Sequence, residues 1–290
     1  MLTTTRTRRC ALLLLLASLL ASLLLALAAP PASAAPAGKR RPPTAEELYD
    51  QGLRQMRRGY YTKALESFNR VRNYHRDDPI SVKAQLAIAD LHYKKGDFEQ
   101  AKFAYEEFAS LHPRHESLDY VTFRIGQSIY RRAPKFAGRD QTATKSAVNV
   151  WTGFDARFPD SQYVDDVNKL LTRGRNRLAS KELHVARFYA RKDSWGAVRN
   201  RAEYLLRRYP DTPQAPRARF LLGNALHAWG EVDAATEVRA AMAERNPDSK
   251  YLHRLDRVLA RPAGEPPDEK IFIRPYRIRG LVPQGAGGGA

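Results

Sequence analysis

The residues with the greatest catalytic potential in this sequence do not form a recognisable reactive group. His112 and His115 flank a proline and precede Glu116, a poor arrangement for metal ligation and one typical of a solvated turn. Asp165 and Asp166 fall at an expected helix start, where carboxylates suit the positive end of the helix dipole. The sequence has no phosphate-binding glycine loop, no nucleophile elbow and no histidine pair on a helix face beside a glutamate. We therefore expect no enzyme, no metal site and no cofactor.

Binding chemistry is indicated instead by aromatic and apolar residues that recur 37 positions apart. Two sets match at this offset and lie seven residues from one another: Tyr49, Leu86 and Phe123, then Met56, Tyr93 and Tyr130. Residues at i and i+7 share one face of a helix, so these six predict a ladder in a groove for aromatic-rich client segments. Polar neighbours that would hydrogen-bond an extended peptide are Gln55, Asp90 and Gln127. Leu86 and Phe123 also fit a core between repeats, and the other members fit either role.

Helices must position this ladder, and the same period defines them. Each first helix has a small residue where its partner approaches: Gly52, Ala89, Gly126, Ala186 or Gly223. Glycines at 59, 96 and 230 suit the positive φ that ends a helix, and prolines at 113, 159, 210 and 247 close the units. In the second helices, Ala64 with Phe68 and Ala101 with Tyr105 share a face. The pattern predicts an all-α tetratricopeptide (TPR) right-handed superhelical solenoid of about five helix-pair repeats over residues 45–260.

Two units depart from the regular pattern, and the end of the chain differs from both. Residues 131–141 form an insertion that either carries function or is simply tolerated. Residues 163–191 contain almost no helix breaker, which predicts one long helix bridging two repeats. Residues 261–290 are basic and rich in proline and glycine, so we expect a disordered tail.

The N-terminus has the features of an export signal. A basic stretch with three arginines precedes an uncharged run at 11–29 and a small-residue cleavage motif ending at Ala34. We expect a signal peptide over 1–34, with an uncleaved anchor as the alternative, and a linker over 35–44. The single cysteine, Cys10, precedes the apolar run and is out of place for lipid attachment. The formal net charge of +18 suits an anionic lipid or glycan surface, or is spread over solvated helix faces; neither nucleic acid nor a small-molecule substrate is expected.

Residues 45–248 resemble the family of the outer-membrane assembly lipoprotein BamD, a five-repeat TPR protein. The most specific matches are residues 118–121 with Gly126, 139–141 with Ala147, 158–163 with Asp166, and the run from Glu182 through 185–189, Trp195 and Ala197 to 209–213. The resemblance implies a non-catalytic subunit of the outer-membrane β-barrel assembly machinery. Its N-terminal repeats would bind unfolded outer-membrane proteins through the client groove (Tyr49, Met56, Leu86, Tyr93, Phe123, Gln127 and Tyr130). Its C-terminal repeats would bind the periplasmic domains of the barrel-forming, BamA-like subunit, with Trp195 and Arg201 near that interface.

The family is normally a lipoprotein, and this chain lacks a cysteine at the expected lipidation point. The resemblance therefore implies a periplasmic location at the inner face of the outer membrane, held through partners or through an uncleaved N-terminal anchor. A TPR adaptor for cell-wall or polysaccharide-export proteins in the periplasm is the alternative function, favoured by the basic surface.

Overall fold

The computed structural model describes residues 41–265. The predicted signal peptide, most of the linker and most of the tail lie outside the described residues. The chain divides into two compact units at Thr44 and Ala45, and every helix discussed below belongs to the second unit. Between residues 41 and 265 the secondary structure is helical and contains no strand.

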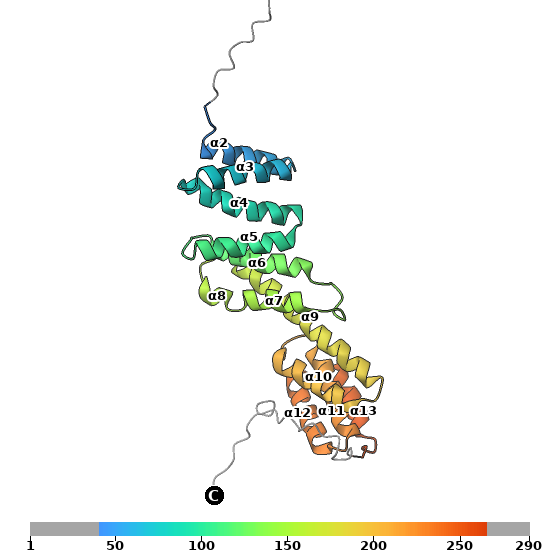
Figure 1. The fold of residues 1–290 in the computed structure, drawn as a ribbon. Helices are drawn as coiled ribbons and strands as arrows, with labels where there is room; N and C mark the ends of the chain where they lie inside the picture. Colours follow the sequence, from blue (N-terminus) through green and yellow to red (C-terminus); the bar gives the residue numbers. More distant parts are fainter. Residues whose placement is uncertain (1–40, 266–290) are drawn as a thin grey trace, which may run out of the picture. The chain divides into compact units, whose positions relative to one another are not determined.

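The helices follow one another as antiparallel pairs, stacked in chain order (Figure 1). The first three pairs are α2 (Ala45–Arg57) with α3 (Tyr61–Tyr74), α4 (Pro79–Lys95) with α5 (Phe98–Leu111), and α6 (Leu118–Arg132) with α7 (Thr142–Trp151), the last followed by the short α8 (Phe154–Arg157). The next two are α9 (Val164–Ala190) with α10 (Trp195–Arg208) and α11 (Ala215–Ala228) with α12 (Val232–Arg245), and α13 (Lys250–Leu259) packs on α11. The predicted all-α TPR solenoid is confirmed.

The turns and close contacts of these pairs follow from particular residues. Gly96 ends α4 with a φ of 91°, a left-handed conformation that a side chain would strain. Gly126 lets α6 approach α7 so closely that the indole ring of Trp151 occupies the space of a missing Cβ atom. Trp151 is fully buried, and its Nε1 donates to the carbonyl oxygen of Phe123 at 3.3 Å. Small residues on first helices thus allow bulky residues of second helices to fill the core.

The core continues from one repeat to the next. One cluster of buried side chains joins α4 to α9, and another joins α7 to α12. Leu171, in the middle of α9, packs against both clusters. The long helix predicted for residues 163–191 is confirmed as α9, which spans 27 residues and joins the third repeat to the fourth.

The insertion lies between α6 and α7 and is held by one buried side chain. Gln141 donates from Nε2 to the carbonyl oxygens of Pro134 and Phe136 at 3.2 and 3.0 Å. The hydroxyl of Thr144 donates to Oε1 of the same glutamine at 2.6 Å. A buried amide that satisfies its bonds in this way fixes the loop on α7.

Helix α13 was not identified by the repeat pattern. Leu252 and Leu255 are buried, and Leu255 fills the space beside Gly223 of α11. The helix covers the last repeat, which would otherwise expose its apolar side. After α13 the backbone N–H of Gly264 donates to the carbonyl oxygen of His227 at 3.1 Å, so the chain returns to the end of α11.

Candidate functional site: an aromatic and arginine ladder

Asp90 on α4 joins three helices through tyrosine hydroxyls. The hydroxyl groups of Tyr105 on α5 and Tyr120 on α6 both donate to Oδ1 of Asp90, at 2.5 and 2.6 Å. Burial, followed by the negative charge of Asp90, raises the pKa of Tyr120 to about 12 and that of Tyr105 further. Both hydroxyls therefore remain protonated donors at neutral pH. Oδ2 of Asp90 accepts no hydrogen bond from a described residue.

Arg124 on α6 lies between aromatic side chains of two repeats. Its guanidinium carbon is 4.5 Å from the ring centroid of Tyr93 and 5.1 Å from that of Tyr120. Nε donates to the hydroxyl oxygen of Tyr120 at 3.0 Å, and Nη1 donates to Oε1 of Gln127 at 2.9 Å. The guanidinium is half-buried, yet no carboxylate of residues 41–265 forms an ion pair with it. A cation held by tyrosine and glutamine retains capacity for an anionic or carbonyl partner.

A second arginine repeats this arrangement one level further along the chain. The guanidinium carbon of Arg177 on α9 lies 4.5 Å from the ring centroid of Tyr130, which also packs against Trp151 at 5.8 Å. Tyr93 is half-buried and meets Phe98 edge to face at 5.3 Å. Tyr93 and Tyr130 thus each have one side in the core and one side against an arginine. We call Tyr93, Arg124, Gln127, Tyr130 and Arg177 the aromatic and arginine ladder.

The remaining predicted groove residues lie deeper in the core or at the first repeat. Phe123 is 6% exposed and stacks on Tyr163 with ring centroids 4.9 Å apart. Leu86 packs against the cluster that joins α4 to α9. Tyr49 and Met56 are half-buried beside the cluster of the first repeat, where Tyr49 meets Phe68 at 5.7 Å. The core role weighed for Leu86 and Phe123 agrees with these positions.

Two of the polar residues predicted to hydrogen-bond a client peptide are held by the protein itself. Gln55 accepts from the hydroxyl of Ser67 at 2.9 Å, and Gln127 accepts from Arg124. Arg124 and Arg177 were not identified from the sequence, because a charged residue on a helix is normally expected to face solvent. The only local indication was that Arg124 stands four residues after Tyr120 and three before Gln127, spacings that place side chains on one helix face.

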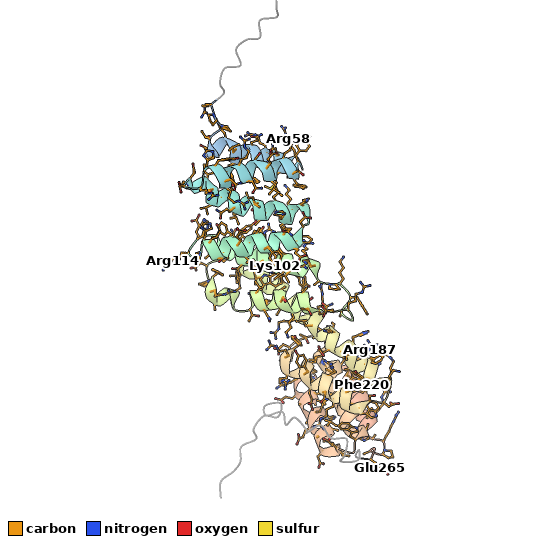
Figure 2. All side chains as sticks on the ribbon, in the orientation of Figure 1. Arg58, Lys102, Arg114, Arg187, Phe220 and Glu265 are labelled. Atoms are coloured by element: carbon orange, nitrogen blue, oxygen red, sulfur yellow. The ribbon has the colours of Figure 1, made fainter. Side chains whose placement is uncertain are left out.

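The two residues assigned to the partner interface have different surroundings. Trp195, at the start of α10, packs with Ala186, Val198 and Leu221, so much of its ring stabilises the fold. Arg201 is exposed and donates from Nη1 to Oε2 of Glu182 at 3.1 Å. Side chains projecting from other turns and helices, among them Arg58, Arg114 and Arg187, extend the basic character of the surface (Figure 2).

The histidines at 112 and 115 take part in packing. A ring nitrogen of His112 lies 2.9 Å from Oε1 of Gln85, and Nδ1 of His115 accepts from the backbone N–H of Ser117 at 3.1 Å. Within the described part of the chain, no three His, Cys, Asp or Glu side chains are grouped as metal ligands would be. In that same part, no helix combines the length and the apolar character needed to cross a membrane.

Antiparallel helix pairs stacked in chain order around a continuous core define a TPR protein. A family model described as "YfiO: Outer membrane lipoprotein" matches residues 42–253, and the chain belongs to this family. Its curated relatives include "Outer membrane protein assembly factor BamD" of Xylella fastidiosa strain Temecula1, 29% identical over 71% of this chain and 74% of the relative. The protein of the same name from Neisseria meningitidis serogroup A is 24% identical over 72% of this chain and 82% of the relative.

A third relative of that name, from Vibrio cholerae, is 27% identical over 68% of this chain and 85% of the relative. Among solved structures, the TPR2AB domain of yeast Sti1 aligns at 15% identity with a TM-score of 0.39, covering 75% of this chain and 98% of that one.

Proposed function

We propose that this chain is a non-catalytic subunit of the outer-membrane β-barrel assembly machinery. Its first three repeats would bind unfolded outer-membrane proteins, and its last two would bind the barrel-forming subunit. Membership of the YfiO family and relatives named as assembly factors support this role. The observation that carries the client-binding part is the aromatic and arginine ladder, whose arginines have no carboxylate partner among residues 41–265.

The ladder suits an extended, aromatic-rich peptide for physical reasons. The rings of Tyr93 and Tyr130 offer flat apolar surface, and Arg124 and Arg177 offer donors to peptide carbonyl oxygens. Oδ2 of Asp90 can accept from a peptide N–H, so the site provides both hydrogen-bonding partners that an unpaired backbone needs. A strand that has not yet entered a barrel has such a backbone, with apolar side chains on alternate positions and aromatic side chains near its ends.

Replacement of two ladder tyrosines tests the client site. The probe is a fluorescein-labelled peptide from the last strand of a porin, whose binding is followed by fluorescence anisotropy. We expect the double variant Tyr93→Ala with Tyr130→Ala to bind this peptide with an affinity at least fivefold lower. The matched control is Tyr60→Ala with Tyr74→Ala, which removes two tyrosines that are 57% and 78% exposed outside the ladder. Circular dichroism must report equal helix content in both variants. Equal peptide affinity for the two double variants would remove the ladder from client binding.

The contact with the barrel-forming subunit is assigned to the α9–α10 region. Arg201 is the charged candidate there, because its side chain is 48% exposed while its partner Glu182 is largely buried. We expect Arg201→Glu to reduce the amount of barrel subunit recovered in a pull-down. Arg208→Glu, an equal charge change at the exposed end of the same helix, is the control. Recovery at the normal level with Arg201→Glu would exclude this residue from the interface.

The proposed location is the periplasm, at the inner face of the outer membrane. Co-purification separates this proposal from a role as an adaptor for cell-wall or polysaccharide-export proteins. Recovery of an outer-membrane β-barrel protein with the native chain supports assembly, whereas recovery of cell-wall enzymes without it supports the adaptor. Mass spectrometry of the mature N-terminus decides between a cleaved signal and an anchor.

A further inference from the structure

A cavity of about 750 Å³, open to solvent and lined by both polar and apolar side chains, lies at one edge of the last repeat. It is bounded by the turn between α10 and α11, the start of α11 and the end of α12. Three prolines of the turn and helix start, at 210, 213 and 216, provide rigid apolar faces. The volume lies within the range of pockets that hold small ligands.

Arg219 on α11 is the buried cation of this cavity. The residue is 6% exposed, and Nη1 donates to Oδ1 of Asn246 at 2.8 Å. A neutral amide is its only hydrogen-bond partner among residues 41–265, and no carboxylate there forms an ion pair with it. Arg245 lines the same cavity, and Asp211 is the single acidic side chain on its wall. Two cations therefore face one anion.

The surroundings of Arg219 disfavour its positive charge. Burial and the neighbouring positive charge of Arg245 lower the pKa of Arg219, and Asp211 offsets this only in part. The guanidinium nevertheless stays charged at physiological pH. A buried cation with an incomplete set of partners is stabilised when an anion enters, because the anion supplies the missing hydrogen bonds and charge together.

The second repeat has the same contact without the charge. Gln85 and His112 stand 134 residues before Arg219 and Asn246, and their side chains form the equivalent bridge at 2.9 Å. A neutral side chain thus suffices to join a first helix to the end of the second helix, and Arg219 is not required for that packing.

We propose that this cavity binds a carboxylate of an acidic peptide segment from a partner protein. A planar guanidinium matches a carboxylate with two parallel hydrogen bonds. Asp211 opposes a doubly charged phosphate more strongly than a singly charged carboxylate, and it can accept from a peptide N–H. The proline faces suit the apolar parts of a peptide chain. The site lies apart from the aromatic and arginine ladder and from Arg201, so it goes beyond the proposed function.

Nuclear magnetic resonance titration of the full chain tests this inference. The probe is the acetylated and amidated peptide Ala-Glu-Glu-Ala, compared with Ala-Gln-Gln-Ala and with inorganic phosphate. We expect the glutamate peptide to cause saturable shifts at the backbone amides of Thr212 and Asn246 and at Nε of Arg219. Arg219→Gln, which recreates the side chain of the second repeat, should weaken this binding about tenfold or more.

Matched variants keep the test specific. Arg217→Gln makes the same charge change on α11 outside the cavity, and should leave the affinity within twofold. Arg245→Gln alters an exposed side chain of the cavity, so it should fold normally and weaken the peptide about threefold even where Arg219→Gln disturbs the fold. Equal shifts with the glutamine peptide, equal losses in Arg217→Gln, or tighter binding of phosphate than of the glutamate peptide would each overturn the proposal.

Discussion

Gly126→Ala should destabilise the protein, although alanine is the better helix former. A Cβ atom at this position would lie 2.2 Å from Nε1 and 2.3 Å from Cε2 of Trp151. The indole is fully buried, so the ring cannot turn toward solvent to make room. The substitution must push α6 and α7 apart or rotate the ring away from its hydrogen bond with Phe123.

The expected loss follows from three contributions of similar size. Overpacking a tight core costs about 1–3 kcal/mol, and losing the indole hydrogen bond costs about 1 kcal/mol. Replacing glycine by alanine inside a helix returns about 1 kcal/mol. The net loss is about 2 kcal/mol, which for a chain of this size lowers the midpoint of thermal unfolding by about 4–8 °C.

Thermal unfolding followed by circular dichroism measures this change, and Gly138→Ala provides the control. A Cβ atom at Gly138 would lie 2.5 Å from Phe136, a clash of similar distance. Phe136 is 61% exposed, so its ring can move into solvent, and the stability should change by at most about 0.5 kcal/mol. A Gly126→Ala variant that melts at or above the temperature of the wild type would refute the packing described for Trp151.

Three further substitutions probe other contacts. Gly96→Ala meets no atom within 4 Å but must adopt a φ of 91°, so urea unfolding should report a loss of about 1 kcal/mol from backbone strain alone. Arg199→Ala removes the partner of Glu203 at 2.9 Å and of Glu231 at 2.7 Å, and should cost about 1–3 kcal/mol at neutral pH. Burial raises the pKa of Glu203, so that loss should shrink as the pH falls and the folded state takes up a proton; a loss independent of pH would contradict this. The pKa of Tyr120 is about 12 in the folded protein and about 10 in an unfolded chain. This difference contributes stability that is present below pH 10 and lost as the pH rises to 12. In Tyr120→Phe, the free energy of unfolding should therefore fall less between pH 10 and pH 12 than in the wild type.

The helices could be predicted because their information is local and repeated. Small residues such as Ala64 and bulky residues such as Phe68 recur in phase with the helical turn, and both are fully buried as expected. Gly96 and Pro210 end their elements for reasons that depend on one residue each. Helix α13 was missed although it follows Pro247 as α11 follows Pro210, because no second helix follows it among the described residues to complete a repeat.

The side-chain contacts between repeats could not be predicted in the same way. Asp90 was predicted to hydrogen-bond a client peptide, but its bonds to Tyr105 and Tyr120 depend on how three helices approach one another. Arg124 and Arg219 illustrate the same limit, since a charged residue on a helix is exposed in most proteins. Their roles depend on which rings or cavities neighbouring helices bring to them, and single-helix periodicity contains no such information.

Helix α9 also bears on how the protein unfolds. In most repeat arrays, adjoining units are joined by a short turn, and one unit can open while the next stays intact. Here the third and fourth units share an unbroken rod of backbone hydrogen bonds, with Leu171 contacting the cores on both sides. Opening that border would require melting the rod itself, so strain applied at the first repeats reaches the last repeats without a hinge to absorb it.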